Sequence, residues 1–231
     1  MEITPIACMR APFGEKFGIP RQSGLVPVRC TIVFEPEFRN TDALRGLEGF
    51  DRLWLIWGFS ANVKRNASSG TASWQALVRP PRLGGNTALG VFATRSPFRP
   101  NPLGLSCVEI ESIELSGPDG PCINVLGADL MDGTPIYDIK PYVPYADAFP
   151  DARGGFADAN PWKPLDVAFS DDLTCLDAGE REMLTRVLAQ DPRPGYHSDA
   201  SRIYGMKFGK WNVNFRVDEN GKLLVTSLQP L

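Results

Sequence analysis

Short segments in which apolar and polar residues alternate recur along the first two thirds of the chain. Every second residue from Val28 to Phe34 is apolar, as expected for a half-buried strand. Further short apolar segments, bounded by turn residues, lie at 52–59, 90–94, 105–115, 122–126 and 136–142. The apolar parity of 105–115 shifts once, which predicts a β-bulge. Regular short strands joined by Gly and Pro turns predict a closed or nearly closed β-barrel.

The pattern changes after residue 146. Residues 147–166 are rich in Asp, Ala, Gly and Pro and are predicted to form a linker. Asp177 and Glu180 resemble a capping box, and the apolar face that follows predicts a helix with Met183, Leu184, Val187 and Leu188 on one side. Alternation in 211–217, followed by a turn at 218–221 and a second apolar run to 228, predicts a hairpin. A shorter helix is expected at 40–47, capped by Asn40 or Thr41.

These elements give a mainly β chain with two folded parts. Residues 1–146 are expected to form the β-barrel, 147–166 the linker and 167–231 a small α+β domain. The 22 Gly and 21 Pro residues among 231 also disfavour a helical bundle. A chain of this length can bury a core without disulfides or a metal.

Several common chemistries are excluded by the residues present. The chain has one histidine, His197, so a metal site with several His ligands is impossible, and no Cys/His zinc spacing occurs. No GxSxG, GxxxxGK[ST] or GxGxxG motif is found, which argues against a hydrolase triad, a P-loop and a Rossmann-type cofactor site. We expect no metal.

The cysteines and apolar runs bear on location. The five cysteines lack close pairs and are best explained as reduced thiols. The N-terminal segment lacks the features of a signal peptide, and the apolar run at 53–59 is too short to span a bilayer. We therefore expect a cytoplasmic protein without membrane contact.

Charge is unevenly distributed although the net charge is −3. Residues 52–108 contain seven cations and no acid, whereas 147–182 contain nine acids and three bases. One part of the chain is thus suited to face a polyanion, although chance clustering on a solvated surface explains the same numbers.

Two segments are too polar and too rich in proline for ordinary core. In the first, Pro97, Pro100 and Pro102 stiffen a loop that presents Arg95, Ser96, Arg99 and Asn101. In the second, the DGTP sequence at 132–135 predicts a tight turn in which Gly133 adopts positive φ. Arg and Asn can simply cap turns, but two arginines in a stiff loop without neighbouring acids favour an anionic ligand. Trp54 and Trp57 are interpreted as core residues.

The sequences ATRSPFRPNPLGLS (93–106) and DGTPIYDIKPYVPYAD (132–147) resemble the two signature segments of the TsaA-like, TrmO family of tRNA N6-adenosine methyltransferases. Weaker similarity extends over almost the whole chain, at 15–25, 46–57, 79–86, 187–194 and 212–217. The resemblance implies a non-Rossmann β-barrel that holds S-adenosylmethionine at or near a homodimer interface. It also implies N6 methylation of N6-threonylcarbamoyladenosine beside the tRNA anticodon, at position 37.

The resemblance also assigns site residues. The methyl donor would contact Gln22, Ser23, Gly24, Ser60, Ala61, Arg95, Leu105, Met131, Asp132, Gly133 and Thr134. The family often has His-Gln where this chain has Ser60 and Ala61, so a side-chain contact at that point is not carried over.

Methyl transfer needs the acceptor nitrogen roughly 3–3.5 Å from the methyl carbon and a group that accepts the N6 proton. Asp138 and Asp132 are the candidate acceptors, although each residue type more often caps a turn. The threonyl group of the substrate carries a carboxylate, which Arg95 or Arg99 would bind through a bidentate fork. Substrate binding is assigned to Arg82, Arg99, Asn101 and Lys140, with the basic run 52–108 facing tRNA phosphates.

Other functions stay open from sequence alone. The chain could be a non-catalytic barrel that binds S-adenosylmethionine or RNA. It could also methylate another RNA or a small nucleotide. As a third alternative, its RPPR sequence (79–82) could serve as a polyproline II ligand.

Overall fold

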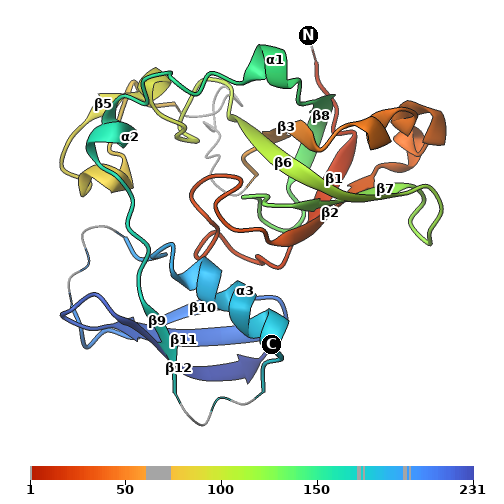
Figure 1. Cartoon of the computed structure of the whole chain (residues 1–231). Helices are drawn as coiled ribbons and strands as arrows, with labels where there is room; N and C mark the ends of the chain where they lie inside the picture. Colours follow the sequence, from red (N-terminus) through yellow and green to blue (C-terminus); the bar gives the residue numbers. More distant parts are fainter. Residues whose placement is uncertain (1, 61–73, 171–172, 174, 195–196, 198) are drawn as a thin grey trace, which may run out of the picture.

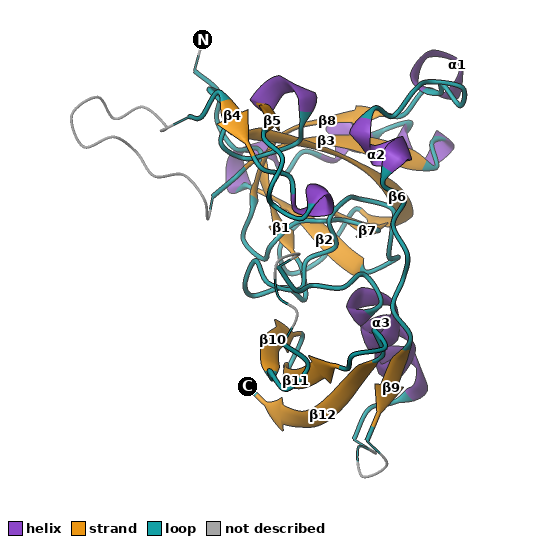
Figure 2. Ribbon diagram, turned by 90° about the vertical axis from the view of Figure 1, so that its left-hand side faces the viewer, coloured by secondary structure: helices purple, strands orange, loops and turns teal. Residues whose placement is uncertain are grey.

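The computed structural model describes residues 2–60, 74–170, 173, 175–194, 197 and 199–231 of the chain. Figure 1 shows two parts, a β-barrel formed by the first two thirds of the chain and a smaller sheet formed by the C-terminal third. Figure 2 shows the same parts one above the other, with α3 (Ala178–Leu188) between the barrel and the C-terminal sheet. No helix among the described residues is long and apolar enough to cross a membrane.

Six antiparallel strands close into the barrel in the order β1-β2-β7-β6-β3-β8, with β8 pairing back to β1. They are β1 (Ala7–Arg10), β2 (Arg29–Phe34), β3 (Arg52–Gly58), β6 (Leu103–Glu114), β7 (Cys122–Leu126) and β8 (Pro135–Pro141). Inward-facing side chains fill the barrel and are almost fully buried, including Met9, Ile32, Leu53, Leu55, Val108, Ile123, Val125 and Ile136. The predicted barrel is therefore confirmed, and so is the bulge, because the β6–β7 register shifts between Ile110 and Ser112.

Two of the predicted local elements are wrong. The segment 90–94 was expected to be a strand, but β5 (Leu89–Gly90) ends after two residues and a 3-10 turn (Val91–Ala93) follows. The expected helix at 40–47 is instead two 3-10 turns, Thr41–Leu44 and Leu47–Gly49. Gly46, at φ 87°, lies between them in the left-handed region and interrupts the helix. The predicted cap is present, since the Asn40 side chain accepts a hydrogen bond from the Asp42 N–H.

Small elements lie in the connection from β3 to β6 and in the connection from the barrel to the C-terminal part. β4 (Leu77–Val78) pairs with β5, and a 3-10 turn (Pro81–Leu83) follows β4. Two short helices, α1 (Pro144–Asp147) and α2 (Phe156–Ala159), lie along the connection to the C-terminal part. Of the two, only α2 lies wholly within the linker predicted at 147–166. α2 contacts the 3-10 turn that follows β4, because Arg82 Nη1 donates to the Ala157 carbonyl over 3.4 Å.

The C-terminal part is a four-stranded sheet with one helix packed on it. The sheet order is β10-β11-β12-β9, formed by β10 (Tyr204–Phe208), β11 (Trp211–Val217), β12 (Leu223–Pro230) and β9 (Val167–Phe169). The predicted hairpin is confirmed by β11 and β12, and the predicted capping box by the mutual hydrogen bonds of Asp177 and Glu180 at the start of α3. α3 buries Leu184, Val187 and Leu188, which share one helical face.

The loop between β1 and β2 joins the two parts. The ring centroids of Phe13 and Phe208 are 5.7 Å apart, and Phe17 stacks on both Tyr204 and Phe215 at centroid distances of 6.3 and 6.2 Å. The Gly209 N–H donates to the Pro12 carbonyl over 2.8 Å. As a result, buried residues of the barrel and of the C-terminal sheet form one continuous apolar cluster.

Candidate functional site

A cavity of about 460 Å³ opens at one end of the barrel. Its described lining comes from four regions: the β1–β2 loop, the end of β3, the Pro-stiffened loop with the start of β6, and the segment before β8. The lining residues are Lys16, Ile19, Pro20, Arg21, Gln22, Trp57, Phe59, Ser60, Thr94, Arg95, Arg99, Leu103, Gly104, Leu105, Asp129, Met131 and Thr134. The volume falls in the range of roughly 300–1,000 Å³ usual for small-molecule sites.

The structure brings the two signature segments together within one chain. Arg95 and Arg99 of the first segment and Thr134 of the second line this cavity, together with Met131. Seven residues assigned from the sequence lie in the described lining, namely Gln22, Ser60, Arg95, Arg99, Leu105, Met131 and Thr134. Ala61, also assigned, lies outside the described residues.

One carboxylate, Asp129, is part of this lining. Its Oδ1 accepts a hydrogen bond of 2.5 Å from the Ser106 hydroxyl, which in turn accepts one of 2.9 Å from Trp57 Nε1. Trp57 is paired with Gly104 across β3 and β6, and Ser106 lies two residues further along β6, on the same face of the sheet. The Trp57–Ser106 contact therefore fixes the position of the Asp129 carboxylate.

Burial raises the pKa of Asp129 above its ordinary value of 3.8. Hydrogen bonds from Ser106 and from the backbone, and the positive charge of Arg95, act in the opposite direction but do not cancel this effect. The carboxylate thus lies in a partly desolvated position with a cation nearby.

Arg95 is held at the cavity by Gln22. Its Nη1 donates to Gln22 Oε1, and Gln22 Nε2 donates to the carbonyl of Arg21 over 2.5 Å. The cavity therefore presents a cation and an anion, Arg95 and Asp129, beside the apolar surfaces of Trp57 and Phe59, which contact each other edge to face at 4.4 Å.

Three residues assigned from the sequence, Ser23, Gly24 and Gly133, stabilise the backbone around the cavity but are not part of its described lining. Ser23 Oγ accepts from the Cys107 N–H over 3.2 Å, and the Gly24 N–H donates to Gly127 O over 2.9 Å. Gly133 has φ 72°, as the predicted tight turn requires, and the turn is closed by a 2.7 Å bond from Thr134 Oγ1 to Met131 O.

The two carboxylates proposed from sequence as proton acceptors lie outside the described lining. The Asp132 carboxylate accepts from the Ala11 N–H over 3.0 Å and faces a separate shallow depression that Arg10, Thr31 and Asn124 also line. Asp138 pairs with Lys140 Nζ at 2.9 Å and caps the Ile139 N–H. Both carboxylates thus have protein partners.

The residues assigned to substrate binding are spread around the site. Arg99 Nη1 donates to the carbonyls of Thr94 and Ser96 at 3.1 and 3.4 Å, so it braces its own loop while lining the cavity. Arg82 donates to Ala157 O over 3.4 Å. Lys140 and Asn101 are exposed and do not belong to the described lining.

Sequence reasoning missed Asp129, Ser106 and Arg21. Asp129 follows an apolar strand and a glycine, in the sequence CINVLGAD, so an acid at a strand end was a usable signal. Trp57 was correctly interpreted as core, since it is buried, but it also lines the cavity. Arg21 gave no local signal, because its partners lie about 170 residues further along the chain.

These residues fit S-adenosylmethionine, which the family resemblance implies. The donor joins an adenine to a sulfonium and an amino acid group, so it needs an apolar surface, an anion and a cation. Trp57 with Phe59, Asp129 and Arg95 offer these three within one cavity. Among the described residues, no group of three or more His, Cys, Asp or Glu side chains is placed to hold a metal ion.

Comparison with known proteins identifies relatives over the full length of the chain. Residues 8–148 match the family model of the tRNA-methyltransferase O N-terminal domain, and 163–231 match that of the TrmO C-terminal domain. A tRNA (adenine(37)-N6)-methyltransferase of Escherichia coli is 37% identical over 97% of this chain and 96% of its own length. An enzyme of the same description from Eikenella corrodens is 52% identical over 66% of this chain and 86% of its own.

A solved structure supports the same relationship. The crystal structure of TrmO from Pseudomonas aeruginosa has a TM-score of 0.78 and 34% identity, covering 99% of this chain and 98% of that chain. Descriptions of further relatives name S-adenosylmethionine. The chain belongs to the TrmO family of tRNA methyltransferases.

Proposed function

We propose that this chain is an S-adenosylmethionine-dependent tRNA methyltransferase that modifies N6 of adenosine 37. The observation that carries the proposal is the cavity at which the two signature segments meet, with Arg95 and Asp129 in its lining. The descriptions of the relatives support tRNA as the substrate and S-adenosylmethionine as the methyl donor. We expect the enzyme to act in the cytoplasm.

Asp129 and Arg95 are proposed to hold the charged end of the donor. The donor carries a sulfonium and an ammonium against a single carboxylate, so a site with one anion and one cation complements it. Asp129 would face the cationic groups and Arg95 the carboxylate, for which a guanidinium is well suited. Trp57 and Phe59 supply the aromatic surface of the same cavity.

When bound, the donor supplies an electrophilic methyl group for in-line displacement. The protein then has to hold N6 in line with the carbon–sulfur bond, because correct orientation of the two reacting groups accelerates the transfer. For the N6 proton we propose Asp132 or Asp138 as the acceptor, as the sequence suggested. Because N6 must lie beside the donor methyl group, the acting carboxylate has to come within hydrogen-bond reach of the cavity mouth when tRNA binds. Asn substitution at that residue should lower kcat at saturating donor.

We further propose that the preferred substrate is N6-threonylcarbamoyladenosine. Its carboxylate would meet Arg99, which lines the cavity on a proline-stiffened loop. The rigid loop lowers the entropic cost of holding such a group. Unmodified adenosine lacks the carboxylate and should be a poor substrate.

Methyl transfer from tritiated S-adenosylmethionine tests both the proposed methylation of tRNA and the proposed preference for N6-threonylcarbamoyladenosine. The substrates are one tRNA prepared with and without the threonylcarbamoyl group, each analysed as nucleosides after reaction. We expect the label on N6 of the modified nucleoside only. Arg99→Met should lower kcat/KM for the modified tRNA at least tenfold, in line with loss of a charge-assisted pair. Equal use of both tRNAs would disprove the finer substrate assignment.

A non-catalytic binding barrel is the alternative that the same experiment addresses. The departure of Ser60 and Ala61 from the usual His-Gln pair favours it. Such a protein would bind the donor and transfer no label to either tRNA.

A further inference from the structure

The β1–β2 loop belongs both to the cavity and to the interface with the C-terminal sheet. Its residues Lys16, Arg21 and Gln22 line the cavity. Phe13 and Phe17 of the same loop pack on aromatic residues of β10 and β11. The middle of the loop therefore takes its position from the C-terminal part, although the cavity lies in the barrel.

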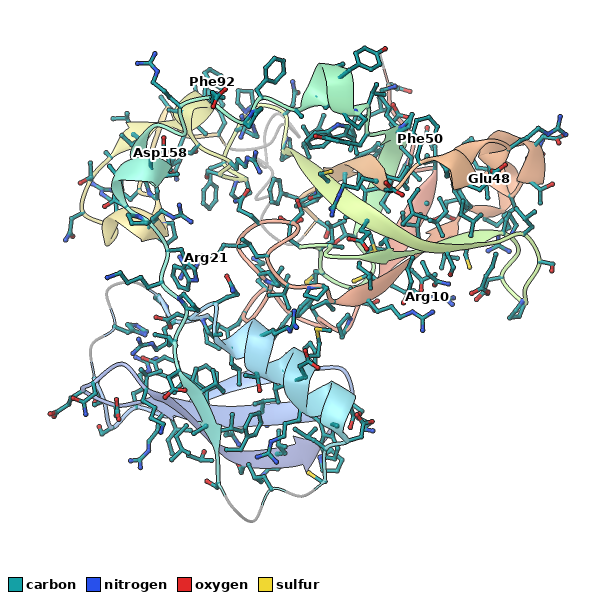
Figure 3. The ribbon with its side chains drawn as sticks, in the orientation of Figure 1. Arg10, Arg21, Glu48, Phe50, Phe92 and Asp158 are labelled. Carbon is teal, nitrogen blue, oxygen red and sulfur yellow. The ribbon has the colours of Figure 1, made fainter. Side chains whose placement is uncertain are left out.

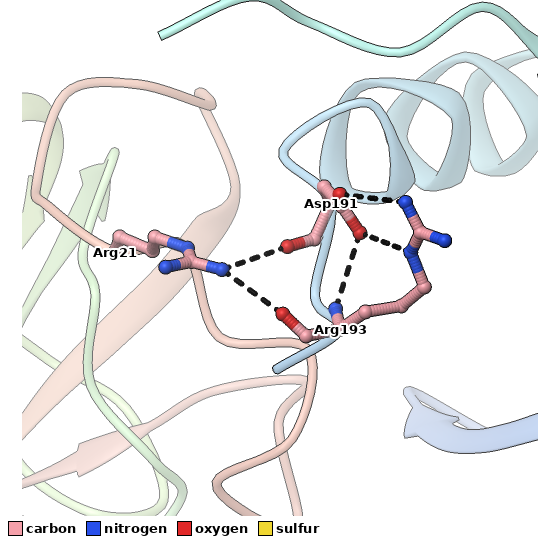
Figure 4. A network of polar contacts seen from close by, with 3 residues as sticks. All are labelled: Arg21, Asp191 and Arg193. Atoms are coloured by element: carbon pink, nitrogen blue, oxygen red, sulfur yellow. Dashed lines mark hydrogen bonds and ion pairs between the residues drawn. The ribbon is translucent and has the colours of Figure 1, made fainter. Parts of the chain in front are cut away.

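Arg21 makes the most specific contact across this interface. Its Nη2 donates to two backbone carbonyls of the C-terminal part, those of Asp191 and Arg193, at 3.1 Å each. Its guanidinium also lies 5.4 Å from the centre of the Trp162 ring. Figure 4 shows the two carbonyls converging on the Arg21 side chain, and Figure 3 shows Arg21 between the barrel and the sheet.

The turn at 191–193 is built to present these two carbonyls. Asp191 has φ 48°, the only positive value among the described non-glycine residues, and such a conformation costs about 1 kcal/mol or more unless its surroundings hold it. The Asp191 carboxylate accepts from Arg193 Nε and Nη2 at 2.8 and 3.0 Å, and both side chains are largely buried. The ion pair thus fixes the left-handed turn, with both carbonyls directed at Arg21.

A chain of hydrogen bonds continues from Arg21 into the cavity. The Arg21 carbonyl accepts from Gln22 Nε2, and Gln22 Oε1 accepts from Arg95 Nη1. Movement of Arg21 would therefore change the position of Gln22 and of the arginine that we assign to the carboxylate of the donor.

We propose that the turn at 191–193 of the C-terminal part positions the donor-binding loop of the barrel through Arg21. Asp191 and Arg193 are positioning residues, since neither belongs to the described lining of the cavity. The inference rests on the proposed function for the identity of the ligand. The coupling between turn and loop does not depend on that identity, so it can be measured on the free protein.

The test disrupts the turn at 191–193 by substitution and measures the effect on the β1–β2 loop. Arg193→Met removes the partner of the Asp191 carboxylate without touching the cavity. Arg186→Met is the matched control, because Arg186 forms an exposed ion pair with Glu182 at 2.7 Å in the same part of the chain. Asp191→Asn and Asp191→Ala add a graded pair, since Asn tolerates a left-handed backbone and keeps one acceptor whereas Ala does neither.

Hydrogen–deuterium exchange of the full chain without ligand is the first readout. Peptides covering 16–25 should exchange at least about threefold faster in Arg193→Met than in Arg186→Met, as expected when a local opening becomes easier. Unchanged protection of these peptides in Arg193→Met and Asp191→Ala would overturn the proposal, whatever the ligand of the cavity is.

Calorimetric titration with S-adenosylmethionine, in the absence of tRNA, is the second readout. We expect Kd to rise about fivefold in Arg193→Met and more in Asp191→Ala than in Asp191→Asn, as for loss of one or two hydrogen bonds. A lower melting temperature with unchanged Kd would show a merely structural turn and contradict the proposal. Failure of the unaltered chain to bind the donor would instead contradict the proposed function.

Discussion

At the scale of single residues, the site depends on a carboxylate that the protein keeps partly out of water. Asp129 has a raised pKa because burial disfavours its charged form, and Ser106, held by Trp57, fixes its position. Such a group costs stability where it is ionised, and a cationic ligand offsets that cost. Replacing Asp129 by a neutral residue should therefore lower the affinity for the cationic donor and raise the stability of the ligand-free protein.

Asp129→Asn removes the charge and keeps the shape. Affinity for S-adenosylmethionine should fall about tenfold or more, corresponding to roughly 1.5–3 kcal/mol for a hydrogen bond to a charged group. Affinity for 5′-methylthioadenosine, which lacks both cationic groups, should not change. Competition titration of the two ligands measures the difference, and an equal loss for both would show that Asp129 acts through packing.

The pH dependence of stability follows from the sign of the same shift. The folded protein binds the Asp129 proton more tightly than the unfolded chain, so ionisation costs stability as pH rises from 3.8 through the raised folded pKa. The unaltered chain should therefore lose stability relative to Asp129→Asn over that interval. Melting temperatures of both proteins between pH 4 and 7 test this, and a difference that is constant with pH would contradict it.

At the scale of elements, β3 and β6 place Trp57 over Gly104, and the absence of a side chain at Gly104 makes room for the ring. A Cβ added at Gly104 would lie 2.2 Å from the Trp57 ring, closer than any real contact. This explains why a strand residue that lines the cavity is glycine.

Gly104→Ala should displace the Trp57 ring and its hydrogen bond to Ser106. We expect a loss of about 1–3 kcal/mol in the free energy of unfolding, as for overpacking, together with weaker donor binding. Gly90→Ala is the matched control, because a Cβ at Gly90 meets nothing within 4 Å and its φ is negative. Chemical denaturation of both variants makes the comparison, and equal stability of the two would disprove the steric argument.

Most strands were predictable from sequence because alternation is a local property. β2, β3, β6, β7 and β8 follow it, and so does the β11–β12 hairpin. β10 was not predicted although it forms a hairpin with the adjacent β11, and the alternation of its buried Tyr204, Met206 and Phe208 was a local signal that was missed. β1 was not predicted either, and it takes its position from residues distant in sequence, at Thr31–Phe34 and in β8. The same limit applies to the site. The signature loop and the DGTP turn were found from their own residues, whereas Arg21 and Asp129 are defined by contacts across the fold.

At the scale of the whole molecule, the barrel and the C-terminal sheet share one apolar cluster. A large part of the apolar surface near β4 and β5 is nevertheless exposed, with Phe92 at 74%, Leu77 at 63% and Trp74 at 50%. Figure 3 shows Phe92 at the outer edge of the segment that contains β4 and β5. The family resemblance implies a homodimer, and we expect this exposed apolar surface to lie in its interface.

Phe92→Glu should prevent that association. Analytical ultracentrifugation is expected to show a dimer for the unaltered chain and a monomer for this variant, because a charge would be buried without a partner. Leu115→Glu is the control, because Leu115 is similarly exposed but lies away from β4 and β5, and this variant should stay dimeric. A monomer for the unaltered chain at micromolar concentration would refute the proposed homodimer.

The cavity between the two signature segments is proposed to hold the methyl donor. A crystal structure of the chain with S-adenosylhomocysteine is the test. We predict density for the ligand between Trp57, Arg95 and Asp129, with the amino acid carboxylate at Arg95. Density in the depression around Asp132 and Asn124, or anywhere else on the chain, would contradict it.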